Sequence, residues 1–352
     1  MCQSLPVTAK KRRRSAWPLV GIAVSSIMTI WFVRDIQWDQ IGAPLVSVGK
    51  VAVGAASMLL LLEFWLRACR WKVVLKPAAP GARVRDLFVA SLVGAAGNTL
   101  LPMRAGEIGR ALVAHRRCGV GLATVLATNV MERVTDLFGL VAVLVAMVLL
   151  LPDQLGGSAA EQTLVDNLQL YGGVLGIGAL VAMSIFFALA RVPERAKSLA
   201  ALLLTGASER FRNRILSLLD ACLAGFASAG DVALLRTSLG LSLVLWFNGS
   251  FAIFLLFKAF SLDLPYAAAC FTTVAIALTV LLPQAPGFFG VFHVAIEKTL
   301  VLWQVPEASA EAFAIVFWAV SFVPVTALGL LAIWREGITL GSLRDSAGPP
   351  GG

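Results

Sequence analysis

The chain of 352 residues is 59% hydrophobic and 14% charged, with a net charge of +9 and a mean hydropathy of +0.85. A soluble domain of this length cannot hide so much apolar surface in one core, so the composition excludes a soluble protein and predicts an integral membrane protein. The basic excess is typical of membrane topology and contact with anionic headgroups, and we expect no nucleic-acid partner. Apolar runs of about 20 residues can cross the hydrocarbon layer as helices, which predicts a polytopic, all-α fold.

The sequence offers no pattern for a metal, a cofactor or a disulfide. Its five cysteines are scattered without CxxC or metal-ligand spacing, and they fall mostly in apolar or interfacial stretches. They are Cys2, Cys69, Cys118, Cys222 and Cys270. We therefore expect neither a metal site nor a cofactor.

The N-terminal part reads as a basic tail followed by a membrane anchor. Residues 1–15 contain the run KKRRR and are expected to stay in the cytoplasm, because short basic segments do so. The apolar run at 16–33 has features of a signal peptide, but no small-residue cleavage pattern precedes Arg34 and the run is long enough to span. We expect a retained signal anchor.

The remainder of the first half alternates apolar and basic segments. A span at 51–68 returns to the cytoplasm at a basic cluster that includes Arg67 and Arg70. Residues 86–115 are apolar but interrupted by a proline, and a full crossing there would leave several arginines outside the cell. A re-entrant hairpin that enters and leaves on the cytoplasmic side satisfies both observations. A further span is predicted at 134–151.

The second half contains a similar series of segments. A span at 171–190 runs inward and is followed by an amphipathic connector at 196–229, which we expect along the inner membrane surface or packed on the bundle. A span at 234–257 runs outward, and a second interrupted apolar segment at 264–302 is predicted to form another hairpin. The last span is predicted at 312–334.

A repeated signature connects the two halves. The stretch LLPMRAGEIG recurs 181 residues later as LLPQAPGFFG, and the same shift places the central spans of the first half on apolar spans. Each half then has an odd number of crossings, so the second copy is upside down relative to the first. The predicted fold is an all-α polytopic membrane protein, an inverted-repeat helical bundle with about six full spans and two re-entrant helical hairpins. The repeats are 16–155 and 156–335, and 336–352 form a disordered tail.

The first copy of the signature carries charges that the second copy lacks. Arg104, Glu107 and Arg110 are three residues apart and share one face of a half-helix. Because each charge costs about 2.5 to 3.5 kcal/mol at the centre of a lipid-facing helix, we expect them to line a cavity. Two arginines beside a helix N-terminus predict a phosphate site. Alternatively, the charges only lock the hairpin to the bundle through an ion-pair ladder. The partners in that ladder are Glu132, Arg133 and Asp136.

These stretches resemble the transmembrane region of lysylphosphatidylglycerol synthases, also called the flippase-like family. The family pattern P-x-R-x-G-E-x-x-R, followed by E-R-x-x-D, is matched by NTLLPMRAGEIGRAL and TNVMERVTDLFGL. The matching residues are Pro102, Arg104, Gly106, Glu107 and Arg110, then Glu132, Arg133 and Asp136. The resemblance covers residues 17–335. The second family signature appears as PQAPGFFGVFH, with Phe288 where glycine is common and His293 where glutamate is common.

The resemblance implies translocation of a lipid. In the two-domain enzymes of the family, a cytoplasmic domain attaches lysine to phosphatidylglycerol and the membrane part moves the product across the bilayer. We expect no room for that domain in 352 residues, so only translocation carries over. The lipid is a phospholipid, a hopanoid or a polyprenyl-linked or glycolipid species. The alternative is a membrane enzyme, or an accessory subunit, in lipid or lipid-linked glycan synthesis, although no nucleotide-binding loop or catalytic set is visible.

The candidate substrate site draws on both signatures. We expect a lipid partner with an anionic phosphate headgroup, and a homo-oligomer or a lipid-biosynthesis protein as a further partner. We expect a bacterial inner membrane protein with both termini in the cytoplasm. His293 is more often a packing histidine than a proton carrier. The candidate residues are Asn98, Pro102, Arg104, Gly106, Glu107, Arg110, Glu132, Arg133, Asp136, Pro283, Gln284, Gly287, Gly290 and His293.

Overall fold

The computed structural model describes residues 42–101, 106–150, 232–280 and 286–337, together with isolated residues near 30–40 and between 170 and 216. Every regular element in the four continuous ranges is a helix. The protein is therefore an all-α polytopic membrane protein, as its composition predicts. Several predicted segments lie wholly or largely outside the described residues. They are the basic tail at 1–15, the first span at 16–33, the span at 171–190, the connector at 196–229 and the tail at 336–352.

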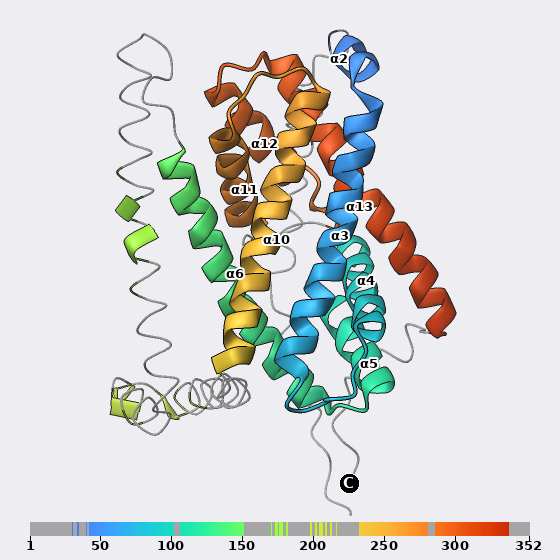
Figure 1. Ribbon diagram of the computed structural model, residues 1–352, viewed down its shortest axis with the longest axis vertical. Helices are drawn as coiled ribbons and strands as arrows, with labels where there is room; N and C mark the ends of the chain where they lie inside the picture. The colour runs from blue at the N-terminus through green and yellow to red at the C-terminus, as the bar shows by residue number, and fades with distance from the viewer. Residues whose placement is uncertain are drawn as a thin grey trace, which may run out of the picture.

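Four long helices form the frame of the bundle (Figure 1). Three of them, α3, α10 and α13, are long and apolar enough to cross a membrane. The fourth, α6, has a similar length but carries three charged residues near its middle. The bounds are α3 (Lys50–Leu75), α6 (Leu122–Leu149), α10 (Val232–Ala259) and α13 (Glu307–Glu336), and a short helix α2 (Gly42–Ser47) precedes α3.

Two helical hairpins each occupy one half of the bundle's length (Figure 1). The first hairpin consists of α4 (Val84–Leu100) and α5 (Gly106–Cys118) and lies in the lower half of the view. The second hairpin, in the upper half, consists of α11 (Tyr266–Val280), the short turn η2 (Pro286–Phe288) and α12 (Val291–Leu302). The structure thus contains the two hairpins predicted at 86–115 and 264–302, and they enter from opposite ends.

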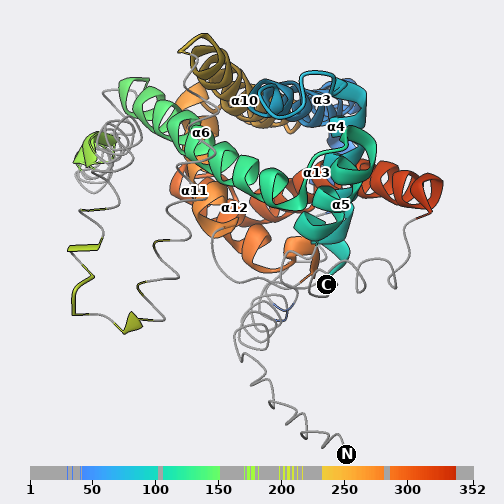
Figure 2. The same ribbon diagram turned by 90° about the horizontal axis from the view of Figure 1, so that it is seen from below.

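The tips of the two hairpins meet inside the bundle, which Figure 2 shows from below. The carbonyl oxygen of Thr99, at the end of α4, lies 3.9 Å from the position that a β-carbon on Gly287 would occupy. Helices of this length reach about 20 to 25 Å at 1.5 Å per residue, which is less than the roughly 30 Å of a hydrocarbon layer. Each hairpin therefore ends within the layer, and its tip contacts the other tip rather than lipid.

The two halves repeat the same order of helices in opposite orientations. α3, α4, α5 and α6 are matched in order by α10, α11, α12 and α13, so each half consists of a long helix, a hairpin and a second long helix. α3 and α10 lie side by side and antiparallel. At one end the amide of Gly49 donates to the carbonyl of Ala259 (2.8 Å), and further along Asn248 donates to the carbonyl of Leu59 (2.9 Å).

Each half has its own apolar core. In the first half, Trp71 and Leu75 of α3 pack with side chains of the first hairpin. In the second half, Phe257 of α10 packs on Phe313 of α13 with ring centroids 5.3 Å apart, and the cluster extends into α11 and α12. Because each hairpin is buried by the long helices of the bundle, the half-length helices have no continuous lipid-facing surface to cover.

One predicted span has different bounds in the structure. The span predicted at 134–151 is part of α6, which begins at Leu122 and continues without a break through the charged residues near its middle. The predicted start near Val134 is therefore wrong. The charges do not end the helix because their side chains have partners on α3 and on the first hairpin, so the backbone keeps its helical hydrogen bonds.

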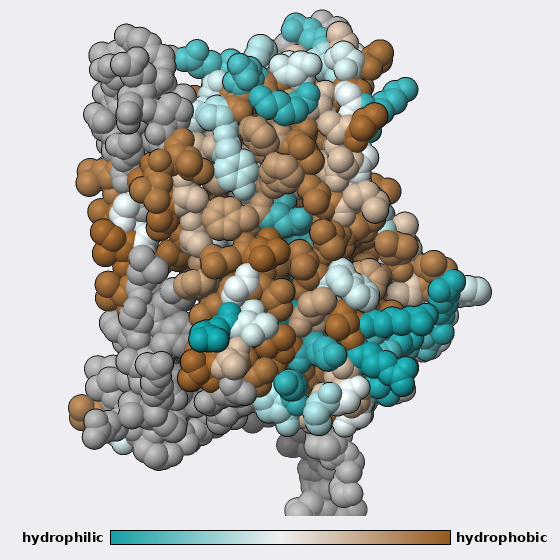
Figure 3. All heavy atoms as spheres, viewed as in Figure 1, coloured by the Kyte–Doolittle hydropathy of each residue, from teal (hydrophilic) through white to brown (hydrophobic). Residues whose placement is uncertain are grey.

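The outer surface is apolar over the middle and hydrophilic towards its ends (Figure 3). We call one end the basic end, because Arg83, Arg85, Arg116 and Arg335 lie there on the helices or loops that finish at that end. At the same end Arg117 of α5 pairs with Asp86 of α4 (2.6 Å) and with Glu336 at the end of α13. These ion pairs attach the open end of the first hairpin to the last helix.

Glycines allow the two helices of the first hairpin to approach closely. A β-carbon on Gly106 would overlap the carbonyl oxygen of Gly94, and a β-carbon on Gly97 would lie 2.6 Å from the α-carbon of Gly106. Since these neighbours are backbone atoms, they cannot turn aside as a flexible side chain does. Gly106 is thus a requirement of the packing and not only a site of backbone freedom.

We predict that Gly106→Ala separates α4 from α5 and lowers the free energy of unfolding by at least about 1 to 3 kcal/mol, the usual cost of overpacking. The control is Gly240→Ala on α10, where a β-carbon would meet nothing within 4 Å. Thermal unfolding of the purified protein in detergent measures both. Equal midpoints for the two variants would contradict the close packing of this hairpin.

Candidate functional site

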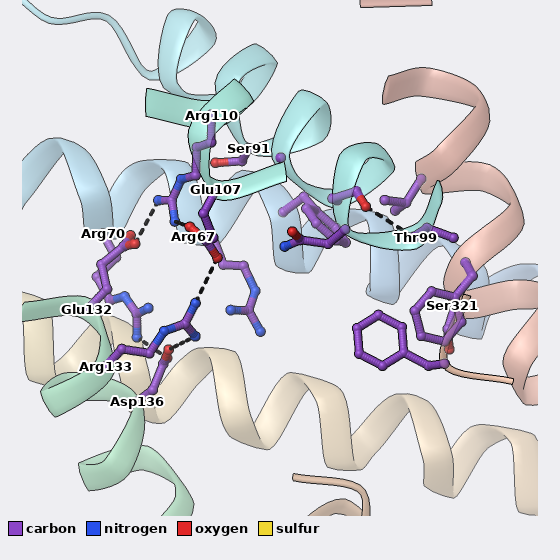
Figure 4. Close-up of a pocket in the computed structure, with 17 residues that line it drawn as sticks. Arg67, Arg70, Ser91, Thr99, Glu107, Arg110, Glu132, Arg133, Asp136 and Ser321 are labelled. Carbon is purple, nitrogen blue, oxygen red and sulfur yellow. Dashed lines mark hydrogen bonds and ion pairs between the residues drawn. The ribbon is translucent and has the colours of Figure 1, made fainter. Parts of the chain in front are cut away.

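A pocket of about 210 Å³ lies where the two hairpin tips meet. Its walls come from α3, α4, α5, α6, η2 and α13, so residues of both halves contribute to it (Figure 4). One side is charged and the other is largely aromatic and hydroxylic. The charged side consists of Arg67, Arg70, Glu107, Arg110, Glu132, Arg133 and Asp136. The opposite side includes Phe288, Ser321 and Phe322.

The most deeply buried charge of the pocket is Arg70 of α3. Only 1% of its side chain is exposed, and its Nη1 donates to Asp136 Oδ1 (2.6 Å) and to Ser242 Oγ of α10 (2.7 Å). A buried guanidinium is tolerated only when a counter-charge and further hydrogen bonds replace its water. Arg70 therefore connects α3, α6 and α10, which are the long helices closest to the pocket.

A second buried pair connects the first hairpin to α6. Arg110 Nη2 of α5 lies 2.7 Å from Glu132 Oε2, and the two side chains are 11% and 5% exposed. The guanidinium of Arg110 also lies over the indole of Trp71, 3.8 Å from the ring centroid. The ring face adds to the attraction of the carboxylate for the cation, so Arg110 is held on two sides.

The third pair lies at the mouth of the pocket. Arg133 donates through Nη2 to Glu107 Oε1 (3.1 Å) and through Nη1 to Asp136 Oδ2 (3.5 Å), as Figure 4 shows. Glu107 also accepts a hydrogen bond from Asn129 Nδ2 (3.4 Å) and lies 4.0 Å from Arg110 Nη1. Arg133 is 54% exposed, far more than Arg70 or Arg110. The charges of the first hairpin and α6 thus form one connected cluster.

Two arginines of α3 were placed incorrectly by the sequence analysis. Arg67 and Arg70 were assigned to a cytoplasmic basic cluster, but α3 continues to Leu75 and both side chains line the pocket. Arg67 Nε donates to Glu63 Oε1 one turn earlier (3.1 Å). That pair was a usable signal, because a carboxylate four residues before an arginine in an apolar run indicates an internal ion pair.

The tip of the first hairpin adds uncharged polar groups. Asn98 lines the pocket, and its Oδ1 is buried without a hydrogen-bond partner among the described residues. The same holds for Arg110 Nε, Glu132 Oε1 and Ser321 Oγ, which also belong to lining residues. Buried polar atoms normally have partners, so such a concentration indicates a place for water or a polar ligand. Pro102 and Arg104 lie outside the described residues.

The second signature shapes a turn rather than a charged site. Gly287 and Gly290 have φ values of 77° and 82°, which side chains rarely adopt, so the glycines allow the chain to turn at the tip. Trp318 Nε1 of α13 donates to the carbonyl of Gly287 (2.8 Å) and holds that turn. Neither glycine lines the pocket, whereas Phe288 between them does. Pro283 and Gln284 lie outside the described residues.

His293 is fully buried and does not line the pocket. Its ring packs on Phe289, with centroids 4.5 Å apart, and near Trp318 at 5.9 Å. The structure therefore separates His293 from the candidate residues of the first hairpin. Its surroundings are those of the packing histidine that the sequence favoured over a proton carrier.

The charges around the pocket balance among the described residues. The four guanidinium groups of Arg67, Arg70, Arg110 and Arg133 face the carboxylates of Glu107, Glu132 and Asp136, and Glu63 pairs with Arg67 from outside the pocket. An anionic ligand can therefore bind well only if a guanidinium exchanges a carboxylate for it. In the described part of the chain, no group of three or more His, Cys, Asp or Glu side chains is arranged to hold a metal ion.

We predict that Arg110→Met lowers the free energy of unfolding by about 3 to 5 kcal/mol, because Glu132 is left buried without its counter-charge. The double variant Arg110→Met with Glu132→Met should recover most of that loss, since it removes both charges. Chemical denaturation of the purified protein measures the three forms. A single variant as stable as the wild type would show that this pair does not hold α5 to α6.

Comparison with known proteins connects this architecture to a family. The family model described as the lysylphosphatidylglycerol synthase TM region matches residues 19–329. A UPF0104 membrane protein of Methanothermobacter thermautotrophicus is 24% identical over 282 residues, which are 76% of this chain and 78% of that relative. The family match includes both hairpins and the pocket between their tips. The chain belongs to the lysylphosphatidylglycerol synthase transmembrane-region family.

Proposed function

We propose that this protein is a lipid translocase that moves a lipid with a phosphate-containing headgroup from one leaflet of the membrane to the other. The headgroup passes through the central pocket, while the acyl or isoprenoid chains stay in the surrounding bilayer. A phospholipid, a hopanoid or a polyprenyl-linked or glycolipid species are the candidate substrates. No enzymatic step is part of this proposal.

One observation carries the proposal, namely a charged pocket at the contact of two half-length hairpins. A structural ion-pair ladder needs every polar group satisfied, but this pocket keeps an empty volume and several unpartnered polar atoms beside its arginines. Guanidinium groups bind phosphate through paired hydrogen bonds. In transporters built from inverted repeats, the substrate site lies near the midplane where interrupted helices meet. The position and chemistry of the pocket both suit the passage of a headgroup.

The basic end gives the proposed orientation. Arg83, Arg85, Arg116 and Arg335 lie at that end, and short basic loops remain in the cytoplasm. We therefore place the open end of the first hairpin on the cytoplasmic side of a bacterial inner membrane, and the open end of the second hairpin on the outer side. The same rule keeps both termini in the cytoplasm. A headgroup would then enter the pocket from one leaflet and leave towards the other.

We predict that Glu107→Gln slows lipid movement at least about tenfold, because the neutral amide no longer attracts Arg133 with a full charge and a charge-assisted hydrogen bond contributes about 1.5 to 3 kcal/mol. Arg104→Ala should slow it as well if the phosphate binds there. The assay uses proteoliposomes with a fluorescent phospholipid and a quencher that stays outside. It measures the fraction of label that becomes accessible with time.

The matched control is Arg116→Gln, an exposed residue on the same helix α5 that does not line the pocket. It should retain the wild-type rate. Wild-type rates in both Glu107→Gln and Arg104→Ala would remove the site from the proposal. Mass spectrometry of the lipids after the assay separates the two function classes, because a translocase changes only sidedness whereas a newly modified lipid would favour an enzyme.

A further inference from the structure

The exposed face of α6 carries one charged residue between apolar ones. Leu126, Arg133 and Leu137 follow each other at intervals of seven and four residues, so they share a face of the helix. Their exposed fractions are 52% for Leu126, 54% for Arg133 and 42% for Leu137. A charged residue in such a stripe is costly next to hydrocarbon, which calls for a physical reason at this position.

The side chain of Arg133 reaches from this face into the mouth of the pocket. Its two terminal nitrogens contact Glu107 Oε1 at 3.1 Å and Asp136 Oδ2 at 3.5 Å. Long basic side chains commonly lay their apolar part over a surface and turn the charge towards a polar region. Arg133 therefore connects the lipid-facing stripe with the charged wall of the pocket.

Among the four arginines of the pocket, Arg133 is the one held most loosely. Arg70 and Arg110 are 1% and 11% exposed and have carboxylate contacts of 2.6 and 2.7 Å. Arg133 is half exposed and its contacts are longer. An exposed ion pair contributes only about 0 to 1 kcal/mol, so a phosphate that approaches from this side can compete for the guanidinium.

Neither carboxylate is left without a partner when Arg133 moves. Asp136 keeps its contact with Arg70 (2.6 Å). Glu107 keeps the hydrogen bond from Asn129 (3.4 Å) and its neighbour Arg110 (4.0 Å). The exchange of one carboxylate contact for a phosphate contact therefore does not create a buried unpaired charge, which would be the expensive outcome.

We propose that the exposed face of α6 beside α5 is a lateral entrance for a phospholipid, in which Arg133 leaves Glu107 and Asp136 to bind the phosphate while an acyl chain lies along Leu126 and Leu137. This proposal rests on the proposed function, because it names the place where a translocated lipid enters the pocket. Arg133 is the first phosphate contact, and the two leucines form the chain-binding surface. The charge balance of the pocket explains why one arginine has to be exchangeable.

A photo-crosslinking experiment tests the entrance without any transport step. Benzoylphenylalanine replaces Leu137 in the full chain, or Val244 as the control, an apolar residue of α10 that is 52% exposed and does not line the pocket. The protein in dodecyl maltoside receives equal amounts of phosphatidylglycerol and of diacylglycerol with the same acyl chains. Intact mass spectrometry after illumination gives the ratio of the two adducts, which does not depend on the total yield.

At position 137 we expect phosphatidylglycerol adducts to exceed diacylglycerol adducts by about tenfold or more, the effect of one charge-assisted contact. Arg133→Ala should bring this ratio close to one, and Arg133→Lys should keep a clear preference. At position 244 the ratio should stay close to one in every form. A ratio near one at position 137 with Arg133 present, or an unchanged high ratio in Arg133→Ala, overturns the proposal.

The same variants separate this proposal from the proposed function. An Arg133-dependent ratio in a protein that moves no lipid in proteoliposomes supports the entrance as a binding site and contradicts translocation. Lipid movement that persists in Arg133→Ala with no headgroup preference at position 137 supports translocation and contradicts the entrance. Thermal unfolding of Arg133→Ala shows whether the variant is folded, and Arg133→Lys gives the answer if it is not.

Discussion

The structure depends on one constraint, which is that polar groups within a hydrocarbon layer must find partners inside the protein. Each hairpin ends within the layer, so its tip exposes the free backbone groups of two helix ends. The bundle satisfies this constraint by bringing the two tips together, as the contact between Thr99 and Gly287 shows. The same junction provides a polar volume that lipid does not reach. Arginines and carboxylates of the first half gather around it, and their mutual pairing makes their burial tolerable.

The two halves share an order of helices but not a chemistry. Glu107 and Phe288 occupy equivalent places in the repeated signature, 181 residues apart, and both line the pocket. The equivalents of Glu132 and Asp136 are Phe313 and Phe317, which belong to the apolar core of the second half. The repeat therefore yields a single pocket with one charged side and one aromatic side. Such a pocket suits a molecule with a polar headgroup and an apolar remainder better than two equal sites would.

Much of the fold could be predicted because it follows from local patterns. Apolar runs of spanning length, a proline with glycines four and seven residues later, and the shift of 181 residues led to the long helices and the hairpins. The cluster around Glu107 and Arg110 was found because buried charges at a broken helix are unusual. Arg67 and Arg70 were misplaced because a charge count cannot tell a loop arginine from one that continues a helix into a buried ion pair. The contribution of Phe288 and Phe322 could not be predicted, since aromatic residues in apolar segments carry no signal of the cavity they face.

The central claim is that the two hairpins enter the membrane from opposite sides. Single cysteines at Arg83 and at Asp263 test it directly in a variant that lacks the native cysteines, because these exposed residues precede the first and the second hairpin. A maleimide that does not cross membranes is applied to intact cells and then to permeabilised cells. We expect the cysteine at 263 to react in intact cells and the cysteine at 83 to react only after permeabilisation. Reaction of both positions from the same side would contradict the inverted architecture and the pocket formed by its two tips.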